Sequence, residues 1–76
     1  MNKNDRKELQ LLINKLEDLR SDIENIRDQE QDKNDNTPEN LQGSEKYDQR
    51  EECIGYLEDA SQAVDDIIDN LTFAMG

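Results

Sequence analysis

Acidic side chains are the groups of this sequence best placed to do chemistry, and they recur as regularly spaced pairs. Three carboxylate doublets follow one another every seven residues in the C-terminal part of the chain: Glu51-Glu52, Glu58-Asp59 and Asp65-Asp66. Paired carboxylates perform acid–base catalysis when they flank a substrate in a pocket. Neighbouring residues on one exposed helix share no pocket, so the doublets do not predict an enzyme. They predict a negatively charged surface along a regular helix, because seven residues make about two helical turns.

Two other features resemble reactive or metal-binding sites but lack residues that such sites need. Cys53 is the single cysteine, and the sequence has no histidine to activate its thiol or to complete a transition-metal site. The segment 32–37 places oxygen-bearing side chains at alternate positions, as a calcium loop does. However, Thr37 stands where that loop needs glycine, and Gly43 stands where it needs a bidentate glutamate. We therefore expect no metal ion and no cofactor, and a buried structural thiol at Cys53 in a reducing compartment.

The composition limits the partners of the chain. The 76 residues include 20 acidic and 9 basic side chains, which give a formal net charge of −11, and 32% of the residues are hydrophobic. This charge repels nucleic acids and anionic membranes, and it favours a protein partner with a basic face. No apolar run is long enough to span a membrane and the N-terminus does not resemble a signal peptide, so we expect a cytoplasmic protein.

The apolar residues follow a heptad pattern in two segments, which predicts two long helices over about 4–33 and 45–74. The first seam advances in steps of three and four residues: Leu9, Leu12, Leu16, Leu19, Ile23 and Ile26. The second seam has the same steps: Cys53, Leu57, Ala60, Val64, Ile67, Leu71 and Ala74. Arg6, Arg20 and Arg27 flank the first seam, and we expect their stems to cover it while their guanidinium groups meet carboxylates.

The segment 34–44 predicts an ordered connector. It contains a cap followed by proline, one apolar residue to plug the end of a hairpin, and a glycine before the next cap: Thr37, Pro38, Leu41, Gly43 and Ser44. Asn4 is the expected N-cap of the first helix. Helices of equal length with a short connection predict an all-α fold, an antiparallel coiled-coil-like hairpin that forms a single domain over 1–76.

The second predicted helix has a wider apolar stripe than one neighbouring helix covers. With Leu57 at heptad position a, further apolar residues fall at positions e and g: Ile54, Tyr56, Ile68 and Met75. A stripe of this width is typical of a helix with two neighbours, and a lone hairpin of this size has a small core. We therefore expect these residues to mediate self-association of two hairpins into a four-helix bundle. Docking of the same stripe on a different protein is the alternative.

The stretch 35–45 carries a resemblance to a known group of proteins. It reads Asp-Asn-Thr-Pro-Glu-Asn-Leu-Gln-Gly-Ser-Glu, and Leu-Glu-Asp-Ala follows at 57–60. The chain resembles small acidic two-helix proteins of bacteriophages and other bacterial mobile elements. These share an Asn-x-Pro-Glu-Asn-Leu-Gln-x-Ser-Glu core between two acidic helices. The resemblance implies a small accessory protein made in a bacterial host and, by analogy, an inhibitor of host machinery such as defence nucleases.

The function expected from these features is non-catalytic. We expect an acidic edge to bind a basic face of a host protein and to inhibit or modulate it; this edge comprises Glu51, Glu52, Glu58, Asp59, Asp65 and Asp66. If that basic face normally holds nucleic acid, the edge would imitate DNA. One helix has two such charges per ~10.5 Å, where DNA has about six, so a dimer imitates DNA better than one chain. The alternative is a self-assembling structural bundle whose carboxylates only keep it soluble.

Overall fold

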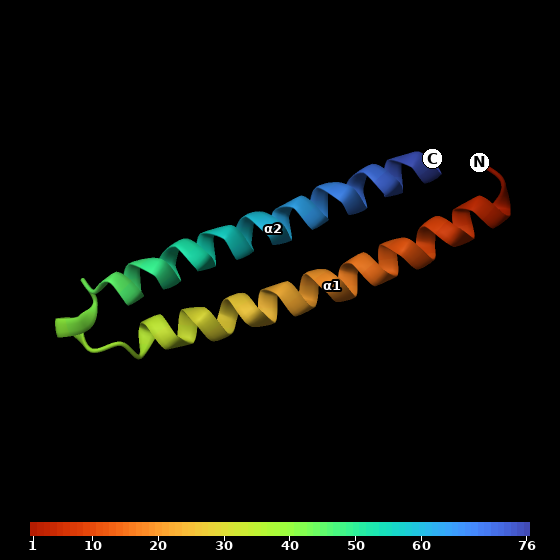
Figure 1. Cartoon of the computed structure of the whole chain (residues 1–76). Coiled ribbons are helices and arrows are strands. Elements are labelled where there is room, and N and C mark those ends of the chain that lie inside the picture. The colour runs from red at the N-terminus through yellow and green to blue at the C-terminus, as the bar shows by residue number, and fades with distance from the viewer.

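The computed structural model describes residues 1–76 as two long helices that lie side by side (Figure 1). Helix α1 spans Lys3–Asp35 and helix α2 spans Glu45–Met75, with one short 3₁₀ turn, η1, at Glu39–Leu41 between them. The helices are antiparallel, and the rod they form extends 60 Å along its axis and 15 by 12 Å across it. Both termini lie at one end of the rod, and η1 lies at the other. The predicted all-α hairpin is confirmed.

The N-cap of α1 is Asn2 and not the expected Asn4. The Asn2 side-chain oxygen accepts a hydrogen bond from the Asp5 backbone N–H at 2.8 Å, and the Asp5 carboxylate accepts one from the Asn2 N–H at 3.4 Å. This reciprocal capping box satisfies two backbone amides that the first helical turn leaves without partners. It explains why the helix begins at Lys3 and includes Asn4. At its other end α1 continues beyond the expected 33 to Asp35.

The connector is ordered, but two of its residues act differently from the expectation. The Thr37 hydroxyl donates to the Lys33 carbonyl oxygen at 2.8 Å, so it closes the end of α1 and does not cap η1. Leu41 is 50% exposed and does not plug the end of the hairpin. Ser44 does cap α2 as expected, because its hydroxyl oxygen accepts from the Tyr47 N–H at 3.3 Å.

The contact between α1 and α2 keeps position a of the predicted seams and replaces position d with position e. Three apolar side chains are buried in it: Ile13, Ile54 and Val64, with 4%, 7% and 8% of their surface exposed. Ile13 and Ile54 lie outside the predicted seams. Half-buried residues extend the contact along both helices at the same spacing: Leu9, Leu16, Arg20, Ile23 and Arg27 on α1, and Leu57, Ser61, Ile68, Leu71 and Met75 on α2. Positions a and e of each helix therefore face the other helix.

Position d, which the heptad pattern assigns to the core, lies outside the contact. Leu12, Leu19 and Ile26 of α1 are 47%, 49% and 51% exposed. On α2, Ile67 is 46% exposed, and Cys53, Ala60 and Ala74 are exposed. The expectation of a buried thiol at Cys53 is wrong, because that position turns out of the contact. The physical reason is that α2 carries apolar residues at a, d and e, and only two of these three positions fit against a single partner helix. At position e, α1 offers Ile13 and the apolar stems of Arg20 and Arg27 to that contact.

Gly55 occupies an interior position of α2 where a side chain has room. A Cβ atom built there meets no atom within 4 Å, and the backbone φ is not positive. Glycine inside a helix costs roughly 0.5–1 kcal/mol relative to alanine, because it loses more conformational freedom on folding. We expect Gly55→Ala to raise the free energy of unfolding by about this amount, measured by urea unfolding followed by circular dichroism. A lowered value would contradict an unobstructed helical position.

Candidate functional site

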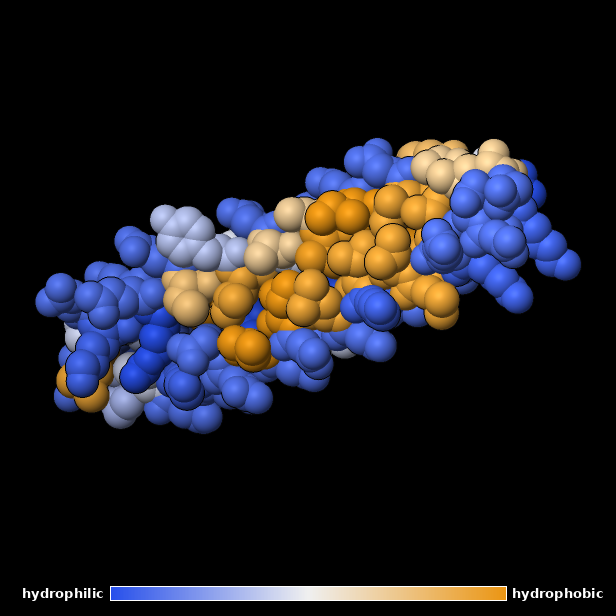
Figure 2. All heavy atoms as spheres, turned by 45° about the vertical axis from the view of Figure 1, so that its right-hand side comes forward, coloured by the Kyte–Doolittle hydropathy of each residue, from blue (hydrophilic) through white to orange (hydrophobic).

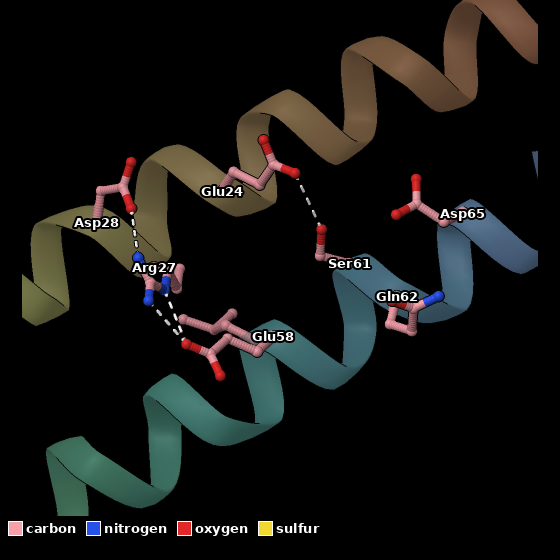
Figure 3. A pocket seen from close by; sticks show the side chains of 8 residues that line it. Glu24, Arg27, Asp28, Glu58, Ser61, Gln62 and Asp65 are labelled. Atoms are coloured by element: carbon pink, nitrogen blue, oxygen red, sulfur yellow. Dashed lines mark hydrogen bonds and ion pairs between the residues drawn. The ribbon is translucent and has the colours of Figure 1, made fainter.

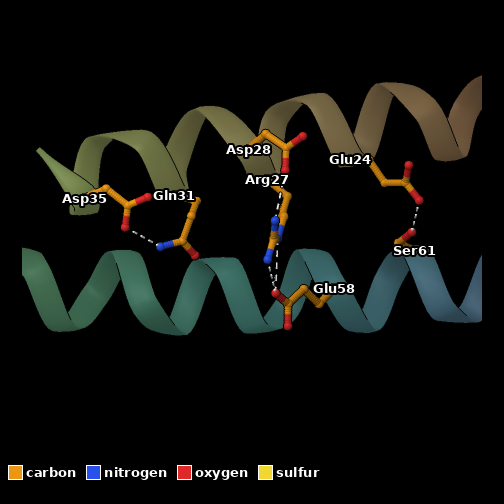
Figure 4. A network of polar contacts seen from close by, with 7 residues as sticks. All are labelled: Glu24, Arg27, Asp28, Gln31, Asp35, Glu58 and Ser61. Atoms are coloured by element: carbon orange, nitrogen blue, oxygen red, sulfur yellow. Dashed lines mark hydrogen bonds and ion pairs between the residues drawn. The ribbon is translucent and has the colours of Figure 1, made fainter.

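One face of the hairpin is polar and holds two ion pairs between the helices. Figures 3 and 4 show one of them, between Arg27 and Glu58. Arg27 of α1 donates from Nε and Nη2 to the Glu58 Oε1 of α2, at 3.1 and 2.8 Å, and from Nη1 to Asp28 at 2.9 Å. One heptad away, Arg20 pairs with Asp65. The expectation that the arginines beside the first seam meet carboxylates is confirmed for Arg20 and Arg27. It is wrong for Arg6, which is exposed and takes part in none of the ion pairs.

The ion pairs raise the pKa of both arginines. The hydrogen bond that Arg20 donates to Asp65, together with the charge of that carboxylate, raises the pKa of the Arg20 guanidinium. Hydrogen bonds with Glu58 and then with Asp28 raise the pKa of Arg27. Both arginines therefore stay charged and offset part of the negative charge of the acidic edge at Glu58 and Asp65.

A shallow groove of about 380 Å³ runs between the helices on this polar face (Figure 3). Its walls include four carboxylates: Glu24, Asp28, Glu58 and Asp65. Three of them are engaged with arginines, and Glu24 accepts a hydrogen bond from the Ser61 hydroxyl at 3.2 Å. The groove is open to solvent along its length and has one apolar lining residue, Leu57. It has the character of an acidic surface more than that of an enclosed substrate pocket.

The expected acidic edge is split into two parts by the way that α2 packs. Glu58 and Asp65, at heptad position b, turn towards α1 and its arginines. At position c, Glu52, Asp59 and Asp66 are exposed, and none of the ion pairs of the structure includes them. We call these three residues the acidic column. The remaining member of the edge, Glu51, lies exposed near the connector end of α2.

Glu51 interacts with Tyr47, which lies one helical turn earlier in α2. Tyr47 is half-buried. Burial of its ring and then the hydrogen bond with Glu51 raise the pKa of the Tyr47 phenol. Glu51 is exposed and takes part in none of the ion pairs, so it remains available to a partner together with the acidic column.

The opposite face of the hairpin is apolar. Figure 2 shows apolar side chains of the two helices gathered in one band along the rod. The residues at position d, on the side of the contact away from Arg27 and Glu58, are exposed: Leu12, Leu19, Ile26, Cys53, Ala60 and Ile67. We call these six residues the apolar face. The apolar face stays on the surface because positions a and e, and not position d, pack between the two helices of the hairpin.

The residues expected to mediate self-association lie mostly inside the hairpin. Ile54 is buried against α1, and Ile68 and Met75 are half-buried in the same contact. Only Tyr56 is freely exposed, at 75%. A second hairpin cannot reach Ile54 while α1 covers it, so the surface open to a second copy is the apolar face.

Asn34 is a buried polar residue that the sequence reasoning missed. It is 2% exposed, and its side-chain Nδ2 donates to the Tyr47 carbonyl oxygen at 3.5 Å, while its Oδ1 has no partner. The signal was present in the spacing, because Asn34 follows Ile13, Arg20 and Arg27 at intervals of seven. A polar residue buried between two helices favours one alignment of them over others.

The side chains and helices of the hairpin meet the requirements of neither a metal site nor a membrane span. No three side chains among His, Cys, Asp and Glu come together in a way that could hold a metal ion. Neither helix has the length and apolar character required to cross a membrane. Comparisons of the chain with protein-family models, with curated proteins and with solved structures find no match.

Proposed function

We propose that this chain is a non-catalytic acidic interaction module that binds a protein through a basic face of that protein. The acidic column is the observation that carries this proposal. Glu52, Asp59 and Asp66 are exposed, stand outside every ion pair, and repeat along a helix that has no basic residue after Arg50. A partner with basic groups at a similar spacing would neutralise charges that the hairpin itself leaves unpaired.

The spacing of the column sets the kind of partner that fits. Carboxylates seven residues apart on a helix are ~10.5 Å apart, which is close to the Debye length of about 8–10 Å in physiological salt. Each carboxylate therefore acts as a nearly separate charge that requires its own lysine or arginine. Such a surface steers association and sets the register of docking more than it supplies affinity.

The biological setting of the proposal comes from the resemblance to small acidic phage proteins. In that setting the partner is a bacterial host protein, and binding inhibits or modulates it by covering its basic face. The most specific form of the proposal is that the partner is a host protein whose basic face binds nucleic acid. The net charge of −11 supports it, because such a face attracts an acidic protein from solution before any specific contact forms.

Two doubly substituted variants with the same net charge test the proposal. Asp59→Lys with Asp66→Lys reverses two of the three charges of the acidic column, and Asp18→Lys with Asp32→Lys reverses two exposed acids of α1. Wild type and both variants are immobilised, exposed to a bacterial lysate, and the captured proteins identified by mass spectrometry and purified. We expect the column variant to bind a captured basic protein at least roughly tenfold more weakly than the α1 variant does. Equal losses of affinity in the two variants would show that net charge alone governs binding, and would overturn a docking role of the acidic column.

Self-assembly is a second candidate function, and a separate observation favours it. The hairpin leaves three large apolar residues of α1 and one of α2 about half exposed on one face: Leu12, Leu19, Ile26 and Ile67. A structural bundle of several copies would cover them, and the carboxylates would then serve solubility.

A further inference from the structure

We propose that a second copy of this chain covers the apolar face, so that two hairpins stack face to face as a four-helix bundle. In this stack α1 of each copy lies over α2 of the other. The proposal concerns the face opposite the ion pairs, and it does not depend on the binding of a basic partner by the acidic column.

The surface area of the single hairpin indicates how much remains to be covered. The chain exposes 5755 Å². A compact folded chain of 8.9 kDa exposes about 4,800 Å², which leaves an excess of about 950 Å². One partner in a stable protein–protein interface buries about 800 Å². The excess is therefore large enough for what one copy would bury in a dimer of ordinary size.

The distribution of acids allows a second copy to approach despite its charge. All nine acidic residues of α2 lie at positions b, c and f: Glu45, Asp48, Glu51, Glu52, Glu58, Asp59, Asp65, Asp66 and Asp69. Positions d and g carry only uncharged side chains from Gln49 to Ala74, including Tyr56, Ala63 and Asn70. Pairing through this face buries no carboxylate of α2 and so avoids the desolvation cost of one. On α1, position g carries Glu8, Lys15 and Asp22, which lie exposed at the rim of the apolar face.

The sizes of the side chains point to a copy of the same chain as the occupant. On α1 the apolar face consists of large residues, Leu12, Leu19 and Ile26, whereas two of its three residues on α2, Cys53 and Ala60, are small. At the levels set by the pairs Arg20–Asp65 and Arg27–Glu58, α1 of one hairpin on α2 of the other places Ile26 opposite Ala60 and Leu12 opposite Ala74. Large side chains thus meet small ones at these two levels, and Leu19 meets Ile67 between them. A two-fold axis along the rod makes this contact twice, once in each direction, as an isologous interface requires. The basic partner proposed above would find no carboxylate to pair with here.

The test is the oligomeric state of the full chain and of three variants, measured by sedimentation equilibrium. We expect a wild-type dimer. Ile67→Glu and Ala60→Glu each place a charge in the proposed interface, and each should raise the dimer dissociation constant at least roughly thirtyfold. Leu11→Glu is the control, because Leu11 is 61% exposed and lies outside the apolar face. Its dissociation constant should stay close to that of wild type.

Ala60→Glu keeps the test valid if Ile67→Glu fails to fold. Ala60 is exposed and makes no part of the α1–α2 contact, and glutamate is a good helix former. Its circular dichroism should therefore match wild type. A monomeric wild type, or a dimer that Ala60→Glu leaves intact, would overturn the proposal. Retained binding of a basic partner by Ala60→Glu would leave the proposed function standing independently.

A distance measurement between spin labels tests the stacking of α1 on α2 directly. With Cys53→Ser to remove the native thiol, Asn40→Cys places one spin label on the connector of each chain. A two-fold axis along the rod puts both connectors at one end, so the label-to-label distance should be well below the 60 Å length of the rod. A distance near that length would mean that the hairpins lie head to tail, and it would overturn this stacking.

Discussion

Replacing Ile13 with alanine is expected to lower the free energy of unfolding by about 2–4 kcal/mol. Ile13 is the most buried apolar residue of the chain, at 4% exposed, and the hairpin buries only two others. Removing its side chain takes away packing that no neighbour can replace, in a domain whose total stability is of the order of several kcal/mol. Urea unfolding followed by circular dichroism gives the difference between variant and wild type.

Leu11→Ala is the control for this prediction, because Leu11 is a nearby apolar residue of α1 that is 61% exposed. Its effect should stay within about 0.5 kcal/mol. Leu12→Ala adds a sharper comparison at a protein concentration low enough to keep the hairpin monomeric. The heptad pattern places Leu12 in the seam and Ile13 beside it, and the structure reverses the two. An effect of Leu12→Ala larger than that of Ile13→Ala would contradict the observed contact.

Added salt is expected to act in opposite directions on the two proposed surfaces. The Debye length falls from about 10 Å at 0.1 M salt to about 3 Å at 1 M. The attraction between the acidic column and a basic partner then weakens, whereas the repulsion between two chains of charge −11 also weakens and their apolar contact does not. We expect the partner affinity to fall, and the dimer affinity to rise, each by roughly tenfold or more over this range.

Sedimentation equilibrium and partner titration in the same buffers measure the two salt dependences. The variant with Asp59→Lys and Asp66→Lys serves as the control, because its lower net charge should make both dependences shallower. A dimer that dissociates as salt is added would show that ion pairs hold it, and this result would contradict pairing through the apolar face. A partner affinity that does not change with salt would contradict binding through carboxylates.

The two helices and most of their ends could be predicted from the sequence, because they depend on local signals. The heptad spacing sets the helices, Ser44 caps α2, and the connector contains proline and glycine where the chain must turn. Asn2 could have been found by the same local reasoning, since Asp5 stands three residues after it, as a capping box requires. Asn4 has no such partner, because Lys7 stands three residues after it.

The rotation of each helix about its own axis could not be predicted in the same way. Positions d and e lie on opposite sides of position a around a helix, and both are mostly apolar in α2, so the pattern allows the contact to turn to either side. In α1 the packing of Ile13 and the pairing of Arg20 and Arg27 with carboxylates favour position e. These contacts join residues about 30 to 45 positions apart along the chain. They depend on the alignment of the helices, which periodicity within one helix does not contain.

For the same reason, the sequence could not show which carboxylate of each doublet faces the other helix and which faces water. Adjacent acids such as Glu58 and Asp59 look equivalent in the sequence, yet they point about 100° apart on a helix. That angle is enough for Glu58 to meet Arg27 while Asp59 remains in water. The doublets therefore combine one carboxylate that stabilises the hairpin with one that is available to a partner.

The repeat of the interhelical ion pairs has a consequence for how the hairpin could change its length. Arg20 and Arg27 are seven residues apart, and so are their partners Asp65 and Glu58. If α2 slid by one heptad, Arg20 would meet Glu58 and Arg27 would meet Glu51, so both arginines would again face a carboxylate. The ion pairs thus define the alignment only to within whole heptads, and the connector selects one of the allowed alignments. A homologous rod lengthened or shortened by seven residues in each helix would keep this pattern of charges, whereas a change of three or four residues in one helix would break it.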